Sequence, residues 1–294
     1  FVHRGILFLM GTDKEHGNLI IRRSEDRGNT WSSPIDSITG LLRTGEYHTA
    51  PMPVISYRGR IWRAVECARS NTDIWGKRYS AMIISAPDSA DLLQAASWSV
   101  TDSLPYDSTY LDGKFGAWLE GNAVVTPDGN VADLLRVDYA PGPEYAALIR
   151  LRDSVSFDPF DPEKDFVRMP GGAKKFTVRY DSLSGRYWSL VNYVTQEWAG
   201  KQNPAWVRNT LALSSSPNLQ EWTVHRTVLH HPDIAKHGFQ YTDWLFDGND
   251  IVLLSRTAYD DNGTGAHNCH DANYMTFHRI KDFRKALTEQ AGNR

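Results

Sequence analysis

Two glutamates, Glu66 and Glu120, are the first candidates for chemistry in this sequence of 294 residues. Glu66 follows the second strand of one predicted β-hairpin, and Glu120 precedes the first strand of the next. Hydrolysis of a glycosidic bond requires two carboxyl groups, because one donates a proton to the leaving oxygen and the other acts as base or nucleophile. We predict that Glu120 is the general acid and that Glu66 is the base or nucleophile.

The other side chains at the ends of the predicted strands are of types that bind ligands, rather than the small polar types usual in solvent-exposed loops. His48 precedes a strand flanked by proline, which holds it extended, and it is a third catalytic candidate. Arginines pair with the carboxylate of an anionic sugar in a bidentate geometry. The residues that we predict to bind substrate are Arg136, Arg256, Lys174, Gln240, Tyr259, His267, His270, Trp118 and Asn192.

The segment 265–274 clusters two histidines, a cysteine and an aspartate, which invites a metal interpretation. Its His-x-Cys-His spacing lacks the paired pattern of a structural zinc site, and no fourth ligand lies nearby in the sequence. We therefore predict a substrate-contacting loop, with no metal and no cofactor. The chain has two cysteines, Cys67 and Cys269, and we expect two free or buried thiols.

Two repeats organise the elements that must position these residues. A hairpin with glycine at its turn occurs at 54–64, 124–134, 176–190 and 244–254, a spacing of roughly sixty residues. Out of phase with it, a turn leads from a strand to a tryptophan three times, at Trp31, Trp98 and Trp222. The strands before these turns are predicted at 19–23, 81–85 and 210–214.

This order of strands is that of a propeller blade, so we predict an all-β fold, a five-bladed β-propeller formed by a single domain over residues 1–294. A six-bladed, sialidase-type ring is the alternative if the segments 101–118 or 196–208 contain further strands. A β-sandwich would explain the strands but not the two repeats in register. In a propeller, the inner strands of all blades start around one end of the central channel, and ligands bind there.

The octapeptide from Ser24 to Trp31 reads Ser-x-Asp-x-Gly-x-Thr-Trp and resembles the Asp-box, or BNR repeat. Asp26 and Ser24 are expected to bond to nearby backbone and so to close the turn. Gly28 tolerates a positive φ, and Trp31 supplies a large apolar body. This motif reports architecture rather than chemistry.

The Asp-box and the repeated tryptophans make the chain similar, over most of its length, to the sialidase-like propellers. Stretches 47–51 and 270–274 are similar to bacterial proteins of this group, which are described as glycoside hydrolases. The chain differs from true sialidases, since it has one complete Asp-box, no Arg-Ile-Pro motif, and only Arg136 and Arg256 as well-placed arginines. Five blades are closer to the arabinanase- and invertase-like glycosidases, which place three acids in the funnel. That resemblance implies a trio of Glu66, Glu120 and either Asp13 or Asp271.

The composition of the chain limits the classes of binding partner that we expect. A formal net charge of -3 gives no reason to expect nucleic acid, and no run of eighteen apolar residues is present to span a membrane. Aromatic residues make up 12%, which suits stacking on sugars, so we expect a carbohydrate substrate. We expect a secreted or periplasmic protein whose signal peptide is removed, and the sequence does not assign an oligomeric state.

The alternative functions are a polysaccharide lyase acting on a uronate, through His48 or a tyrosine such as Tyr259, and a carbohydrate-binding propeller without catalysis.

Overall fold

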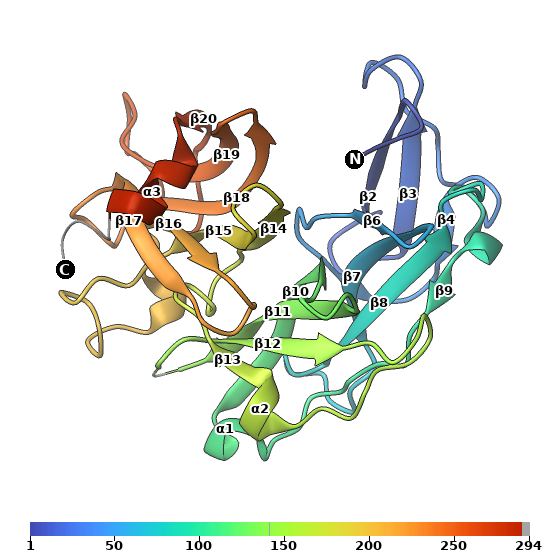
Figure 1. The fold of residues 1–294 in the computed structure, drawn as a ribbon, viewed down its shortest axis with the longest axis horizontal. Helices are drawn as coiled ribbons and strands as arrows, with labels where there is room; N and C mark the ends of the chain where they lie inside the picture. Colours follow the sequence, from blue (N-terminus) through green and yellow to red (C-terminus); the bar gives the residue numbers. More distant parts are fainter. Residues whose placement is uncertain (141, 290–294) are drawn as a thin grey trace. The chain divides into compact units, whose positions relative to one another are not determined.

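The structure, a computed structural model, describes residues 1–140 and 142–289, and these form five antiparallel β-sheets. The sheets are the blades of a five-bladed β-propeller, as predicted (Figure 1). Within the described residues the α-helices are single turns, α1 (Tyr110–Gly113), α2 (Pro162–Asp165) and α3 (Ala286–Glu289), and no helix there is long and apolar enough to cross a membrane.

The chain divides into two compact units, which we describe separately. Unit 1 comprises residues 1–110, 116–135 and 148–165, and unit 2 comprises 111–115, 136–147 and the chain from 166 onward. The single-domain assignment stays a prediction.

Unit 1 contains the first two sheets. The first has the order β1 (Val2–His3), β2 (Ile6–Thr12), β3 (Leu19–Ser24), β4 (Leu41–Arg43). In the second, β5 (Tyr47–His48) and β6 (Ile55–Tyr57) both pair with β7 (Arg60–Ala68), which is followed by β8 (Tyr79–Pro87) and β9 (Ser99–Val100). Pro51 and Pro53 lie between β5 and β6. Because proline donates no ladder hydrogen bond, it interrupts this first strand and leaves His48 at the end of a short piece.

The third sheet supplies residues to both units. Its order is β10 (Phe115–Val125), β11 (Val131–Tyr139), β12 (Tyr145–Arg150), β13 (Phe166–Arg168). Unit 2 contains the fourth sheet, β14 (Thr177–Asp181), β15 (Arg186–Asn192), β16 (Thr210–Ser216), β17 (Thr223–His230), and the fifth, β18 (Gly238–Asp247), β19 (Asp250–Ala258), β20 (Tyr274–Ile280).

All four predicted hairpins are confirmed, as β6–β7, β10–β11, β14–β15 and β18–β19. The glycine of each turn has a positive φ, between 63° and 79°, which explains why glycine marks them. The six-bladed alternative was wrong for the part of the chain that the structure describes. Segment 101–118 holds α1 and the start of β10, and segment 196–208 holds only the short helix η2 (Pro204–Trp206).

Apolar residues of the strands form a large hydrophobic cluster in each unit. In unit 1, side chains of the first two sheets pack together, among them Leu19, Ile21, Ile61, Val65, Met82 and Trp98. In unit 2, side chains of the fourth and fifth sheets do the same, among them Trp188, Leu213, Trp244, Leu253 and Phe283. Strands such as β8 and β16 are buried along almost their whole length, so both of their faces are covered.

The turn between β3 and β4 closes on itself as its residue types predict. Asp26 accepts hydrogen bonds from the Thr30 amide (2.9 Å), the Thr30 hydroxyl (2.7 Å) and the Ser24 hydroxyl (2.7 Å). Ser24 Oγ accepts from the Gly28 amide at 2.8 Å. These donors, the Thr30 amide first, lower the pKa of Asp26 to about 2.

The three repeated tryptophans share one local contact. The indole N–H of Trp31, Trp98 and Trp222 donates to the carbonyl of Gly28, Leu92 and Leu219, at 3.1, 3.0 and 3.0 Å respectively. Each tryptophan is thus tied to its own turn, which explains why the turn and the tryptophan recur together in the sequence.

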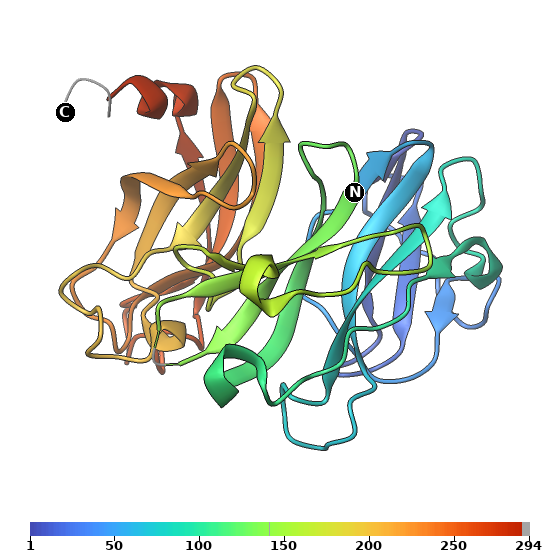
Figure 2. The same cartoon turned by 60° about the horizontal axis from the view of Figure 1, so that its bottom comes forward.

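An ion pair ties the C-terminal segment to the fourth sheet. The helix η3 (Phe283–Lys285) precedes α3, which lies beside β17 (Figure 2). Arg284 donates from Nε and Nη2 to the two oxygens of Asp181 at 2.8 and 2.6 Å. The Arg284 guanidinium, helped by Ser184, lowers the pKa of Asp181 to about 2.

We expect Asp181→Asn to lower the free energy of unfolding at pH 7 by about 1–3 kcal/mol, because the bidentate charge-assisted contact is lost. Since the pKa of the folded state lies below that of the unfolded chain, this stabilisation is present above about pH 4 and is lost as the pH falls toward 2. Thermal melts at pH 7, 5 and 3 should show the difference between variant and wild type shrinking in the last step. Asp282→Asn, in the same segment, is the control, and an equal difference at all three pH values would contradict the assignment.

Candidate functional site

Strand pairing in unit 1 builds a carboxylate–histidine cluster, which we define as His48, Glu66, Gly121 and Asp133. His48 on β5 lies opposite Glu66 on β7 in the ladder. His48 Nδ1 lies 3.0 Å from Glu66 Oε2, and the Gly121 amide donates to Glu66 Oε1 at 2.9 Å. The Glu66 side chain is only 1% exposed, so both of its oxygens are held inside the protein.

Asp133 on β11 is the second carboxyl group of this cluster, and the sequence did not single it out. Its carboxyl is buried, and neither oxygen has a hydrogen-bond partner among the described residues. Burial, followed by the charge of Glu66, raises its pKa well above the usual range. A Cβ on Gly121 would stand 2.3 Å from Asp133 Oδ1, so only glycine fits between the two acids. Burial therefore favours the neutral, protonated form of the Asp133 carboxyl group.

Glu120 lies next to this cluster on β10, in an unusual backbone conformation. Its φ is +54°, and the residue is buried. A positive φ at a non-glycine residue costs about 1–3 kcal/mol and occurs mostly where the surrounding structure imposes it, as at functional sites. Trp118, two residues earlier, is fully buried and donates from Nε1 to the Pro105 carbonyl at 3.0 Å.

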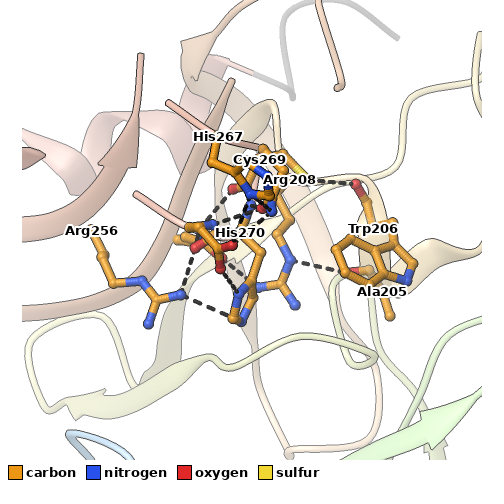
Figure 3. A network of polar contacts seen from close by, with 10 residues as sticks. Ala205, Trp206, Arg208, Arg256, His267, Cys269 and His270 are labelled. Atoms are coloured by element: carbon orange, nitrogen blue, oxygen red, sulfur yellow. Dashed lines mark hydrogen bonds and ion pairs between the residues drawn. The ribbon is translucent and has the colours of Figure 1, made fainter. Parts of the chain in front are cut away.

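Unit 2 contains an arginine cluster, defined as Arg208, Gln240, Tyr241, Arg256 and His270. Figure 3 shows Arg208, Arg256 and His270 of this cluster. The Tyr241 ring lies beside both arginines, with its centroid 4.4 Å from Cζ of Arg256 and 5.8 Å from Cζ of Arg208. Arg256 Nη2 donates to the His270 carbonyl at 2.6 Å, and Arg208 Nη1 donates to Gln240 Oε1 at 2.7 Å. Two guanidinium groups thus flank one aromatic ring.

A local irregularity of β18 determines the orientation of the Tyr241 side chain. Its φ is +50°, and the pairing of β18 with β19 shifts register between Gln240 and Asp243. Such a bulge reorients a side chain without ending the strand. Gln240 fixes the facing loop, because its Nε2 donates to the carbonyls of Cys269 and His270, both at 2.7 Å.

Within the loop 265–274, the carboxylate of Asp271 accepts several hydrogen bonds from neighbouring side chains. Asp271 is exposed and accepts from His270 Nδ1 at 3.0 Å, and this contact, followed by those of Asn268 and His267, lowers its pKa to about 2. His267 is 86% exposed. Among the described residues no group of three or more His, Cys, Asp or Glu side chains is arranged to hold a metal ion. Cys67 and Cys269 are free and buried, as predicted, and burial raises the pKa of both thiols.

Other predicted substrate-binding residues have structural contacts. The Lys174 ammonium is fully buried, where it pairs with Glu144 and donates to the Pro204 carbonyl at 2.9 Å. Asn192 is buried and donates to the Phe239 carbonyl at 2.7 Å. Arg136 is buried on β11, and Tyr259 packs edge-on against His237. Lys174 and Asn192 therefore have no place in the function proposed below.

No protein-family model and no curated protein matches the chain. Similar solved structures include an α-L-arabinofuranosidase from Lactobacillus brevis, with a TM-score of 0.54 and 10% identity over 94% of this chain and 86% of that one. They also include the Hadza microbial sialidase Hz136 (TM-score 0.56, 16% identity, 94% and 50% of the two chains) and Trypanosoma rangeli sialidase with the inhibitor DANA (0.51, 12%, 95% and 46%). The chain spans about half the length of the two sialidases. At this identity the likeness shows the fold, and the fold shared with them is a β-propeller.

Proposed function

We propose that this propeller is a glycoside hydrolase. The observation that carries the proposal is the carboxylate–histidine cluster of unit 1, in which one buried acid is kept protonated beside another that holds a histidine. A carboxyl group whose pKa is strongly raised by burial and by a neighbouring charge marks a candidate acid–base site. The fold supports the proposal, since it is shared with proteins named as an arabinofuranosidase and as sialidases.

In this proposal Glu120 is the general acid and His48 is the general base. Glu66 holds His48 by its Nδ1–H, because both of its oxygens are engaged and its side chain is buried. His48 removes a proton from water, the water oxygen bonds to the anomeric carbon, and the bond to the leaving oxygen breaks as Glu120 protonates it. Direct attack by water inverts the anomeric configuration.

Unit 2, taken by itself, contains a second candidate site, the arginine cluster. Arg208 and Arg256 have planar, permanently charged groups of the kind that bind carboxylates in pairs. We propose that this cluster binds a carboxylate, such as that of a uronic acid.

The experiment is a product analysis with 4-nitrophenyl glycosides of L-arabinofuranose, D-galactose, D-glucuronic acid and N-acetylneuraminic acid, and with polygalacturonate. Proton NMR of the first-formed product should show the inverted anomer, and cleavage in ¹⁸O-water should place one labelled oxygen in the product. Glu25→Gln, an exposed glutamate of the β3–β4 turn, is the control for substitution at a carboxylate. Retention of configuration would contradict the assignment of His48 as base toward water.

A second candidate, a polysaccharide lyase, is favoured by the aromatic ring beside His48, since the Tyr79 ring centroid lies 5.1 Å from that of His48. In this reaction His48 takes the proton α to a uronate carboxylate, a carbon–carbon double bond forms, and the bond to the β-oxygen breaks with protonation of that oxygen. The product from polygalacturonate would absorb in the near ultraviolet and contain no ¹⁸O. Binding of these sugars without any product would support the third candidate, a non-catalytic carbohydrate-binding propeller, and contradict both enzymatic ones.

A further inference from the structure

Unit 1 contains a second histidine beside His48 that the proposed function does not use. His16 lies in the loop between β2 and β3, and its ring centroid is 6.1 Å from that of His48 and 5.7 Å from that of Tyr79. Its φ is +53°, a conformation that is uncommon for a residue other than glycine. The His16 side chain is 23% exposed, and its Nε2 lies 3.5 Å from Oε1 of Glu15, whose own side chain is 89% exposed. A ligand can therefore replace this outer contact of Nε2.

A chain of hydrogen bonds fixes the tautomer of His16. Arg78 Nη2 lies 3.1 Å from the Tyr79 hydroxyl, and that hydroxyl lies 2.5 Å from His16 Nδ1. Arginine has donors only, so the Tyr79 oxygen accepts from Arg78, and the Glu15 carboxylate near His16 Nε2 can only accept. Both neighbours suit a ring that accepts the Tyr79 proton at Nδ1 and donates from Nε2. Nδ1 is then the acceptor, and the proton of the neutral imidazole resides on Nε2.

The charges around His16 agree with a neutral ring. Burial, followed by the positive charge of Arg78, lowers the pKa of His16, while Glu15 and Glu46 act in the opposite direction. Burial also raises the pKa of Tyr79, which keeps the phenol proton available for His16.

His48 has the opposite arrangement. A carboxylate accepts and cannot donate, so His48 Nδ1 carries the proton given to Glu66 Oε2, and the lone pair of the neutral ring is on Nε2. The two histidines thus present opposite hydrogen-bonding groups: His16 a donor and His48 an acceptor, both at Nε2.

We propose that His16 is a substrate-contacting residue whose Nε2–H donates to a sugar hydroxyl next to the carbon at which His48 acts, with Tyr79 and Arg78 as positioning residues. The inference rests on the proposed function, in which His48 directs water to the anomeric carbon. In arabinose, galactose and glucuronic acid the hydroxyl adjacent to that carbon is the one on C2, so His16 contacts a 2-hydroxyl group of such an aldose. Hydrogen bonds to this hydroxyl strengthen as the transition state forms.

The tautomer can be tested without substrate. Long-range ¹H–¹⁵N spectra of the wild-type protein should show His16 as the neutral Nε2–H form at pH 7, and Tyr79→Phe should convert it to a mixture of tautomers. Tyr57→Phe is the matched control, because the Tyr57 hydroxyl also bonds inside unit 1, to the Gly129 carbonyl at 2.9 Å. A protonated ring or an Nδ1–H form in the wild type would overturn the inference, whatever the enzyme cleaves.

Contact with the sugar is tested with the 4-nitrophenyl arabinofuranoside, galactoside or glucuronide that the wild type cleaves and its 2-deoxy counterpart. His16→Ala should lower kcat/KM by about 10- to 100-fold on the hydroxylated substrate and leave it unchanged on the deoxy one, the size of one lost hydrogen bond. His16→Gln, which can place an N–H at a similar reach, should recover part of the loss. If none of the four glycosides is cleaved, the proposed function fails, and calorimetric titration of the same glycosides and their 2-deoxy forms makes the same comparison by affinity. Equal losses on both substrates would overturn the contact.

Discussion

Replacing Glu120 with glutamine should lower kcat/KM for glycoside cleavage by about 10²- to 10⁴-fold, the range expected when a general acid is removed. Glutamine keeps the size of the side chain but has no acidic proton for the leaving oxygen. The loss should be smaller for 4-nitrophenyl glycosides than for oligosaccharides, because nitrophenolate leaves without protonation. Initial rates on both kinds of substrate measure this, and full activity on both would remove Glu120 from the mechanism.

The backbone at Glu120 provides an independent check that this residue is held under strain. At φ +54° alanine is strained and glycine is not, so Glu120→Gly should be more stable than Glu120→Ala by about 1 kcal/mol. At an ordinary strand position the order would be reversed, because glycine weakens strands. Urea unfolding of the two variants distinguishes these outcomes without an activity assay.

Removing Glu144 should destabilise the protein by about 3–5 kcal/mol, because Glu144→Gln leaves the fully buried Lys174 ammonium without its counter-charge. Glu144 Oε2 also accepts from the Gly171 amide at 2.9 Å, so one side chain satisfies two buried donors. Urea unfolding at pH 7 measures the loss. Lys174→Met combined with Glu144→Gln should recover most of it, since the uncompensated charge is then absent.

The pH dependence of Glu144→Gln follows from Lys174. Burial lowers the pKa of Lys174, and Glu144 opposes this, so the variant should have a still lower lysine pKa. The unfolded chain then binds more protons than the folded one up to about pH 10, and stability rises with pH in that window. The free energy of unfolding of the variant should therefore lie closer to that of the wild type at pH 9 than at pH 7. A constant difference would mean that Lys174 has the same protonation state in both folded proteins over this window, so that Glu144 does not set its pKa.

The blades could be predicted from the sequence because their signals are local. Glycine at each hairpin turn and a tryptophan bonded to its own turn are features of a few consecutive residues, and they recur with the blade. Carboxylates near predicted strand ends were equally visible, which is why Glu66 and Glu120 could be named.

The remaining site residues depend on contacts that one sequence does not encode locally. The positive φ of Glu120 and Tyr241 has no residue-type signal, because both are ordinary side chains inside strands. In the sequence, Lys174 looks like an exposed substrate contact at the start of a strand. Its burial is explained by Glu144, thirty residues earlier in the chain, which the fold places beside it as a counter-charge. Arg208 and His16 lie in loops, and their importance appears only with their partners Gln240 and Tyr79. A charged residue inside an apolar run was the one available signal for Asp133.

Each of the five sheets is made of strands that are consecutive in the chain. Closing a short connection costs little chain entropy, so an individual sheet has mostly local contacts to form before any distant ones are needed. During synthesis, the strands of one sheet leave the ribosome together and can pair while the next is still being made. Errors of assembly should therefore arise between sheets rather than within them. They should involve the sheet faces that stay exposed until the next sheet has been synthesised.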